Sequence, residues 1–349
     1  MTRKAEDGQP FLPGPTFAAP YHLSGDPSGK EYTYGRYGNP TWTAYEEAVG
    51  ELEGGEAAVF GSGMGAVSTL LLSLLEPGDR LVLPSDAYFT VRALARDLLP
   101  FDVHEVPTDT EAFVEAAKDA KVVWVETPSN PGLDVVDIRA VAEASEATLV
   151  VDNTLATPLG QRPLSLGADY SVVSASKAVT GHSDLVLGYA AGRDLEPVRA
   201  ARRKLGTIAG PFEVWLAHRS LATLEVRLER QCANALALAK LVEEHVPVRY
   251  PGLPSDPAHG VAKAQMQRFG PVIGFTLPDK PAADAFLQAA DLVIEATSFG
   301  GTHTTAERRA RWGSDAIPEG WIRLSAGCED PEELAGDVGR ALARALGAT

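Results

Sequence analysis

The sequence predicts an α/β protein with a mostly parallel central sheet, helices on both faces and a smaller α+β domain at its carboxyl end. Short apolar runs alternate with helical segments from residue 57 to about 210. This rhythm is typical of strands buried between two layers of helices. After Pro211 a long helical stretch and then shorter elements replace it. We therefore expect an arm over 1–40, a large domain over 41–210, connecting helices over 211–244 and a C-terminal domain over 245–349.

The arm and the first helix differ sharply in pattern. Residues 1–40 are rich in glycine, proline and tyrosine with little periodicity, which predicts an extended arm lying on another surface. Thr43 to Glu46 match a capping box, so a helix is expected from there to about Glu53. Gly54 and Gly55 then end it.

Six strands are expected in the large domain, each a short apolar run. Gly61 to Gly65 separate the first from an apolar helix that ends near Leu75, and Pro77 to Asp79 turn into the second. In parallel sheets ligands bind at the carboxyl ends of the strands, so the functional residues should gather there. The expected strands cover 57–60, 81–83, 102–106, 122–126, 148–151 and 171–174.

The carboxyl half is predicted to be simpler. Residues 212–244 carry Leu, Val and Ala at helical spacing, which indicates one long helix or two in series. Strands are expected at 272–277 and 322–325, and a closing helix after Pro331.

Composition excludes several classes of function. The formal net charge of −16 over 349 residues, with no compensating basic block, argues against nucleic acid or an anionic membrane as partner. Cys232 and Cys328 are too few for a disulfide framework, and the seven histidines show no metal-binding spacing, so no metal is expected. Met1 to Pro10 lack the apolar core of a signal peptide, and no run is long enough to span a membrane. A reducing cytoplasm is the expected location.

Two charged residues follow two neighbouring strands of the predicted sheet. Lys177 comes shortly after the apolar run 170–173, and Asp152 ends the run 148–151. This pairing suits pyridoxal phosphate (PLP), which is held by a lysine as a Schiff base while an acid keeps the pyridine nitrogen protonated. Ser174 and Ser176 precede the lysine, where their hydroxyls could bind the phosphate.

A glycine-rich loop offers a phosphate site and also a rival interpretation. Gly61 to Gly65 follow a strand and open a helix, so their backbone N–H groups can bind an anion. Gly61, Gly63 and Ala66 also match a variant dinucleotide fingerprint, with Asp86 as the ribose ligand. An NAD-binding oxidoreductase is therefore an alternative of a different class, although it leaves Lys177 and Asp152 without a role.

Two residues on later loops could contact a flat cofactor. Tyr88, after the second strand, could stack on the ring and act as an acid or base, or it could be a structural tyrosine. Asn130 lies between Pro128 and Pro131, which forbid a helix there. Its amide could donate to a phenolate oxygen of the cofactor, or the segment could be a structural turn.

Two arginines are candidates for anion binding. Arg36, beside Tyr34 in the arm, could bind phosphate, could support an aromatic subunit interface, or both. Arg323 interrupts the apolar run 322–325, and a buried arginine needs an anion. That anion could be a substrate carboxylate or a structural Asp or Glu.

In this order the motifs resemble the Cys/Met-metabolism PLP family of fold type I. The resemblance covers nearly the whole chain from about Pro10. It rests on Tyr-Gly-Arg-Tyr-Gly-Asn-Pro-Thr, Gly-Ser-Gly-Met, Asp-Ala-Tyr, Glu-Thr-Pro-Ser-Asn-Pro, Val-Asp-Asn-Thr, Ser-Ala-Ser-Lys-Ala-Val-Thr-Gly-His-Ser-Asp, Tyr-Pro-Gly-Leu-Pro-Ser, Ser-Phe-Gly-Gly and Ile-Arg-Leu-Ser-Ala-Gly-Cys-Glu-Asp.

The resemblance implies specific roles for residues of this chain. Lys177 would hold the cofactor and move protons, and Tyr88 would stack on the ring and act as an acid. Arg323, helped by Ser298, would bind the carboxylate of a sulfur-containing amino acid. Tyr34 and Arg36 would reach the site of a neighbouring subunit, which implies a homo-oligomer, by family a homotetramer. The remaining cofactor-binding residues would be Asp152, Asn130, Ser62, Gly63, Met64, Ser174 and Ser176.

The implied reaction is elimination at Cγ of a sulfur amino acid, with cystathionine γ-lyase as the branch that the segments resemble most. Methionine γ-lyase is the first alternative, although its reactive cysteine near the ring tyrosine has no counterpart beside Tyr88. A cystathionine γ-synthase acting on an activated homoserine is the second. A PLP-free binding protein on the same fold would require Lys177 to be idle.

The sequence departs from the family pattern at places that bear on the substrate. Phe89 and Thr90 follow Tyr88 where the family has Gly-Gly-Thr, and Thr297 stands where an acidic or aromatic residue is common. The stretch after Gly301 is shortened and basic. These departures leave the cofactor prediction intact and leave the substrate and the balance of elimination against replacement open.

Overall fold

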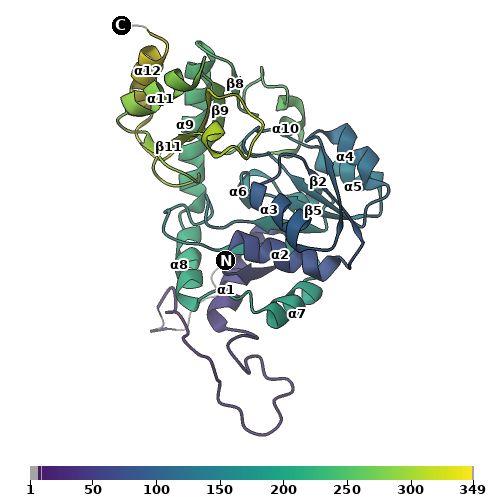
Figure 1. The fold of residues 1–349 in the computed structure, drawn as a ribbon. Helices are drawn as coiled ribbons and strands as arrows, with labels where there is room; N and C mark the ends of the chain where they lie inside the picture. Colours follow the sequence, from purple (N-terminus) through teal and green to yellow (C-terminus); the bar gives the residue numbers. More distant parts are fainter. Residues whose placement is uncertain (1–6, 9, 348–349) are drawn as a thin grey trace.

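Two sheets form the centre of the protein in the computed structural model, which describes residues 7, 8 and 10–347 (Figure 1). The larger sheet has the order β1-β7-β6-β5-β4-β2-β3, and the smaller has the order β10-β11-β12-β9-β8. Neighbouring strands from β3 to β6 run parallel, while β7 is antiparallel to both β1 and β6. The predicted α/β class with a mostly parallel sheet is therefore confirmed. The strands of the larger sheet are β1 (Glu56–Phe60), β2 (Arg80–Pro84), β3 (Asp102–Val106), β4 (Val122–Glu126), β5 (Thr148–Asp152), β6 (Tyr170–Val173) and β7 (Gly188–Gly192).

All six strands expected in the large domain are present, but a seventh was missed. Strand β7 has the sequence Gly-Tyr-Ala-Ala-Gly, which lacks the branched residues that mark a strand. Its small residues suit its position between β1 and β6, because a Cβ on Gly188 would stand 2.6 Å from the backbone nitrogen of Gly63.

Helices cover both faces of the larger sheet, since its strands alternate between two apolar clusters. On one face α2 (Gly63–Leu74), α3 (Phe89–Ala93) and α7 (Glu196–Leu205) pack on residues such as Trp124 and Val150. On the other face α4 (Thr110–Ala117) and α5 (Ile138–Ala144) pack on residues such as Val123 and Val151, while α1 (Pro40–Glu53) and α8 (Pro211–Leu221) pack on residues such as Val59 and Val173. Shorter helical segments are the π-helical turn Leu94–Leu98, α6 (Thr157–Gly160) and the 3₁₀ turn Pro163–Leu166.

The capping box predicted at Thr43 is wrong. Helix α1 begins at Pro40, and its N-cap is Asn39, whose side chain accepts a hydrogen bond from the backbone N–H of Thr41. Proline at the first helical position and asparagine before it are both favourable starts, so this earlier signal prevails. Gly54 ends the helix with a positive φ of 80°, as expected.

The carboxyl half begins with two helices in series, α8 and α9 (Leu224–Glu243), and the long helix α9 runs up to the smaller sheet (Figure 1). That sheet packs with α9, α11 and α12 around one apolar cluster. In the part of the chain that the structure describes, no helix is long and apolar enough to cross a membrane. The elements are β8 (Val248–Arg249), α10 (His259–Gln265), β9 (Val272–Thr276), α11 (Lys280–Ala289), β10 (Ile294–Glu295), β11 (Thr305–Arg308), the 3₁₀ turn Arg309–Trp312, β12 (Trp321–Ser325) and α12 (Pro331–Ala345).

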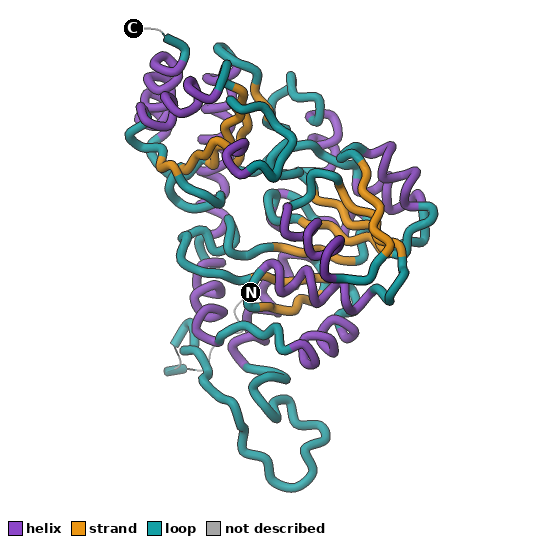
Figure 2. Tube along the Cα trace, in the orientation of Figure 1, coloured by secondary structure: helices purple, strands orange, loops and turns teal. Residues whose placement is uncertain are grey.

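The N-terminal arm projects as a loop beyond the larger sheet (Figure 2). Residues 1–6 and 9 of the predicted arm lie outside the described residues. The base of the arm is held at the start of α1, where the Asn39 side chain donates to the Thr16 carbonyl oxygen at 2.8 Å and the Thr16 N–H donates to the Thr41 hydroxyl at 2.9 Å. Tyr34 and Tyr37 are exposed.

The turn after Lys177 depends on one glycine. Gly181 has a φ of +70°, and a Cβ there would stand 1.8 Å from Nη1 of Arg227. That nitrogen donates to the Ala178 carbonyl oxygen at 2.8 Å, so Arg227 joins α9 to the segment that carries Lys177.

We predict that Gly181→Ala lowers the free energy of unfolding by about 3 kcal/mol, because it adds a steric clash to the cost of a left-handed backbone. Gly206→Ala is the matched control, since Gly206 also has a φ of +70° but faces open space. The control should lose only about 1 kcal/mol. Guanidinium unfolding measures both, and equal losses would contradict the role given to Arg227.

Candidate active site

Six strands of the larger sheet, β1 to β6, end at one edge, and the predicted site residues follow five of those ends. Strands β2, β4, β5 and β6 are parallel, and β1 points the same way because both it and β6 are antiparallel to β7. This edge therefore carries the glycine loop after β1, the Tyr88 segment after β2, Asn130 after β4, Asp152 on β5 and Lys177 after β6. The sheet thus gathers residues that lie up to 115 positions apart in sequence (62 to 177).

The glycine loop packs directly against the segment after β6. A Cβ on Gly63 would stand 2.8 Å from Cβ of Ser174, so only glycine allows this approach. The Ser62 hydroxyl caps α2 by accepting from the backbone N–H of Gly65 at 2.9 Å, and Met64 lies in the first turn. The start of a 12-residue helix therefore lies beside Ser174, as an anion site requires.

Lys177 and Asp152 form the electrostatic centre of the site. Burial lowers the pKa of Lys177, the nearby Arg323 lowers it further, and Asp152 opposes both. Burial raises the pKa of Asp152, although hydrogen bonds from Thr154 and the charge of Lys177 partly offset this. The lysine is thereby closer to a neutral, nucleophilic amine than a lysine in water.

A second carboxyl group lies beside Asp152. Glu126 pairs with Asp152 across β4 and β5 and is buried, and its pKa is raised well above the ordinary value by burial and by the Asp152 charge. Its side chain accepts a hydrogen bond from the backbone N–H of Tyr88 at 2.8 Å. Glu126 thus fixes the start of the segment that presents Tyr88, whose side chain is 40% exposed.

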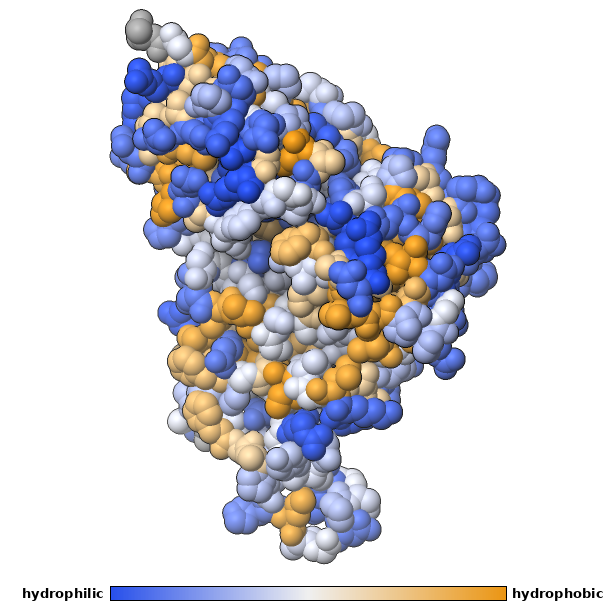
Figure 3. Space-filling model, in the orientation of Figure 1, coloured by the Kyte–Doolittle hydropathy of each residue, from blue (hydrophilic) through white to orange (hydrophobic). Residues whose placement is uncertain are grey.

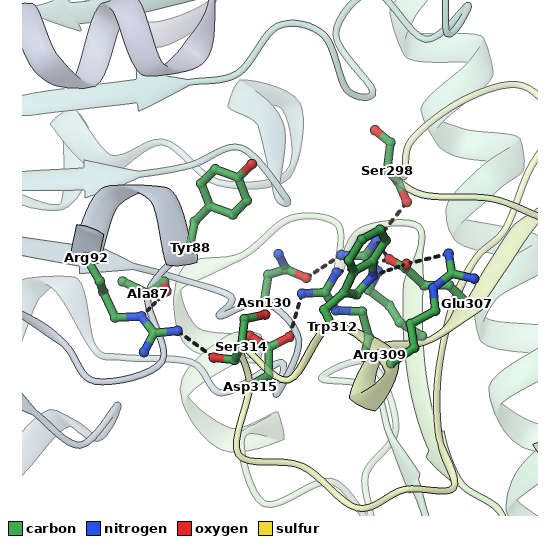
Figure 4. Close-up of polar contacts among 12 residues, drawn as sticks. Ala87, Tyr88, Arg92, Asn130, Ser298, Glu307, Arg309, Trp312, Ser314 and Asp315 are labelled. Carbon is green, nitrogen blue, oxygen red and sulfur yellow. Dashed lines mark hydrogen bonds and ion pairs between the residues drawn. The ribbon is translucent and has the colours of Figure 1, made fainter. Parts of the chain in front are cut away.

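The smaller sheet contributes Arg323, which is buried in β12 and reaches across to the larger domain. Its Nη1 donates to Oδ1 of Asn130 at 2.6 Å, and its Nη2 donates to the Ser298 carbonyl oxygen at 3.0 Å (Figure 4). Nη2 also contacts the carboxylate of Glu307 on β11. Burial lowers the pKa of Arg323 to about 10, while Glu307 opposes that shift. Asn130 and Arg323 are therefore brought together, and Ser298 takes part through its backbone, at a φ of +74°.

Sequence reasoning missed three residues that shape this site. The Phe299 ring lies near both cations, its centroid 5.6 Å from Nζ of Lys177 and 5.3 Å from the guanidinium carbon of Arg323. Glu307 is buried against Arg323, and Arg92 donates to the carbonyl oxygens of Ala87 and Ser314. Glu307 was missed because β11, the strand that pairs it directly with Arg323, was not predicted.

Three predicted cofactor residues have other partners in this chain. The Ser176 hydroxyl donates to the Leu187 carbonyl oxygen at 3.1 Å and accepts from its N–H at 2.9 Å. Arg36 donates to the Arg203 carbonyl oxygen at 2.9 Å, and its guanidinium lies over the rings of Tyr34 and Tyr37. Their phosphate-binding roles stay predictions.

Known proteins resemble this chain over most of its length. Residues 16–343 match the model of the family described as Cys/Met metabolism PLP-dependent enzyme. A Streptomyces coelicolor protein named "Putative cystathionine gamma-lyase" is 54% identical over 96% of this chain and 89% of its own length. A Coxiella burnetii protein named cystathionine β-lyase is 38% identical over 89% of this chain and 87% of its own length. The crystal structure of CalE6 from Micromonospora echinospora, described as a methionine γ-lyase, has a TM-score of 0.91 at 37% identity and covers 98% of this chain and 96% of that one.

Fold and site together define a PLP-dependent enzyme of fold type I. The chain belongs to the Cys/Met-metabolism PLP-dependent enzyme family. The dinucleotide alternative is therefore wrong. In this structure Asp86 accepts a hydrogen bond from the Thr108 hydroxyl.

The residues present fit the cofactor. Lys177 would supply a half-buried amine, Asp152 a carboxylate for the ring nitrogen, and the backbone around Gly63 an anion site that a Cβ would fill. A carboxylate whose charge is poorly solvated favours a cationic partner, which a protonated pyridine nitrogen provides.

We predict that the rate of cofactor attachment to Lys177 rises with pH through a pKa below that of free lysine. Removing the neighbouring cation in Arg323→Gln should move this profile to higher pH, because the pKa of Lys177 rises when the repulsion is removed. Asp152→Asn should move it to lower pH, for the opposite reason. The absorbance of bound cofactor, followed after PLP is added to cofactor-free protein, gives the midpoints. A shift of both variants in the same direction would contradict this account.

Proposed function

We propose that this enzyme is a cystathionine γ-lyase, which converts L-cystathionine and water to L-cysteine, 2-oxobutanoate and ammonia. The observation that carries the proposal is the grouping of Lys177, Arg323 and Phe299 at the sheet edge. This grouping supports a carboxylate anchor at Arg323, close to the lysine to which we assign proton transfer. The name of the Streptomyces coelicolor relative supports the choice of substrate.

Each residue has a task that its surroundings suit. PLP, when bound, supplies an electron sink that makes the Cα and Cβ protons of an amino acid acidic. Arg323 binds the substrate α-carboxylate and so fixes Cα near Lys177. The lowered pKa of Lys177 lets its amine accept a proton from Cα near neutral pH. Asp152 keeps the ring nitrogen protonated.

The second half of the reaction is the departure of the thiol. As the bond between Cγ and sulfur breaks, the cysteine thiolate needs a proton, and the phenol of Tyr88 is the donor we assign. Its segment is anchored by Glu126 through the backbone N–H and by Arg92 through the Ala87 carbonyl oxygen. Water then converts the remaining four-carbon fragment to 2-oxobutanoate and ammonia.

Methionine γ-lyase is the second candidate, because one crystal structure of CalE6 is described as that enzyme, although another is described as a cystathionine γ-lyase. Against it stands the absence of a cysteine near Tyr88 in sequence, because Cys232 and Cys328 are the only two cysteines. A γ-synthase acting on an activated homoserine is the third.

We also propose that the enzyme is a homo-oligomer, by its family a homotetramer, in which the arm completes a neighbouring site. Apolar side chains are exposed near the arm at Val186, Leu205, Ile208 and Phe212. Figure 3 shows apolar surface in the region of α8. A hollow of about 440 Å³ bordered by Gly61, Val186 and Ile208 lies among them. Contiguous apolar surface of this kind is typical of subunit contacts.

Product analysis tests the reaction. Supplied separately with L-cystathionine, L-methionine and O-succinyl-L-homoserine, the enzyme should release cysteine and 2-oxobutanoate from cystathionine fastest. Lys177→Ala should be inert toward all three. Faster methanethiol release from methionine would transfer the assignment to methionine γ-lyase, and inertness of the wild type would overturn all three.

Mixing two inactive variants tests the shared site. Arg36→Ala and Lys177→Ala should each lose activity, because each removes one half of every site. After the subunits are dissociated and reassociated at equal amounts, about a quarter of the sites should combine an intact arm with an intact lysine. Activity should return to about that fraction. If none returns, the arm does not serve a neighbouring site.

A further inference from the structure

Arg323 lacks the parallel pair of free donors that a carboxylate anchor needs. A guanidinium has five N–H groups, and a carboxylate bound in the two-point manner uses two parallel ones. In this protein Nη2 donates to both the Ser298 carbonyl oxygen and Glu307, and Nη1 donates to Asn130. The N–H groups that remain are on Nε and Nη1. A two-point contact that uses Nη2 must therefore displace an existing acceptor.

Glu307 is the acceptor that can leave at least cost, because it has three other donors. Its Oε1 accepts from Nη1 of Arg309 at 3.1 Å. Its Oε2 accepts from Nε1 of Trp312 at 2.9 Å and from Nη2 of Arg311 at 3.2 Å. The side chain of Glu307 is only 1% exposed, so these donors, and not water, determine where its charge is stable.

We propose that Glu307 sets the affinity of this enzyme for its amino acid by competing with the substrate α-carboxylate for Arg323. The substrate carboxylate takes the Nη2 donor, and Glu307 keeps Arg309, Arg311 and Trp312. The inference rests on the proposed function only in taking Arg323 as the carboxylate anchor.

The exchange is balanced in charge and in hydrogen bonds. Both Arg323 and Glu307 remain paired after it, so neither buried charge is left alone, which would be the costly outcome. Glu307 nevertheless weakens substrate binding, because the charge-assisted hydrogen bond between Arg323 and Glu307 must break when the substrate carboxylate binds. Burial depresses the pKa of Arg323, and Glu307 counteracts that shift, which fits a carboxylate held in place of a substrate.

The test uses the PLP-loaded enzyme and L-norleucine, which keeps the length of methionine but has no leaving group. Glu307→Gln keeps an acceptor for Arg323 but removes its charge, so Kd for norleucine should fall about tenfold. Arg311→Gln removes one of the donors that hold Glu307 away from Arg323, so Kd should rise about threefold. n-Pentylamine, which is norleucine without the carboxylate, should bind both variants within about twofold of wild type. Calorimetry gives Kd, and thermal unfolding shows that each variant is folded.

Two controls separate exchange from other effects. Arg308→Gln removes a neighbouring cation that pairs with Asp284 and Glu319 and not with Glu307, so a general change of local charge would raise Kd here too. If Glu307 and the substrate exchange places on Arg323, Kd for norleucine in Arg308→Gln should equal that of the wild type. Arg323→Gln tests the anchor itself and should abolish norleucine binding.

The outcomes are distinct. Opposite shifts in Glu307→Gln and Arg311→Gln, with Arg308→Gln unchanged, support the competition. Weaker binding in both variants would mean that Glu307 only supports Arg323. An equal change of Kd in Arg308→Gln would mean that the effect comes from long-range charge. Either result overturns the inference while the proposed function stands. Unchanged norleucine affinity in Arg323→Gln would overturn the carboxylate assignment and this inference with it.

Discussion

The burial of one arginine is the constraint on which the arrangement of the site depends. Arg323 lies in a strand whose five residues are all buried, so its charge must be satisfied by protein groups. Those groups come from separate parts of the chain: Asn130 after β4, the Ser298 backbone before β11, and Glu307 on β11. Satisfying one guanidinium therefore ties the smaller sheet to the edge of the larger one. The site lies at that junction.

Close backbone approach is the second requirement. Gly63 meets Ser174, Gly188 meets the Ser62 carbonyl oxygen, and Gly300 lies against the backbone of Ala178. The contacts of Gly63 and Gly300 leave no room for a methyl group beside Ser174 and Ala178, which precede and follow Lys177 in the sequence. Close packing before and after the lysine thus limits how far its segment can move.

The sequence allowed the large domain to be predicted well because its strands are short, apolar and separated by turn residues. The expected bounds of β3 and β4 agree with the structure. Strand β7 was missed because glycine and alanine carry no strand signal, and the start of α1 was misplaced because two capping signals compete within four residues. The site residues that were predicted all follow predicted strands or belong to local motifs. Phe299 and Arg92 could not be predicted in this way, because their contacts depend on how distant segments pack.

The basic stretch after Gly301 shows why a departure from a family pattern is hard to interpret from sequence. Arg308, Arg309 and Arg311 suggest a positive surface, yet each is paired, with Glu319, Asp315 and Glu295 among the partners. Around Arg323 three guanidinium groups, those of Arg309, Arg311 and Arg323 itself, meet Glu307 and the acids that pair with its neighbours. The cluster is therefore close to neutral within a protein of net charge −16.

That neutrality has a consequence for recognition. The carboxylate of an amino acid would be repelled by a strongly acidic protein if unbalanced carboxylates surrounded Arg323. Because Arg309 and Arg311 share the charge of Glu307 with Arg323, the substrate carboxylate meets an anchor without a surplus of acids around it. The basic residues thus act through Glu307, which lies between them and Arg323, and need not touch the substrate at all.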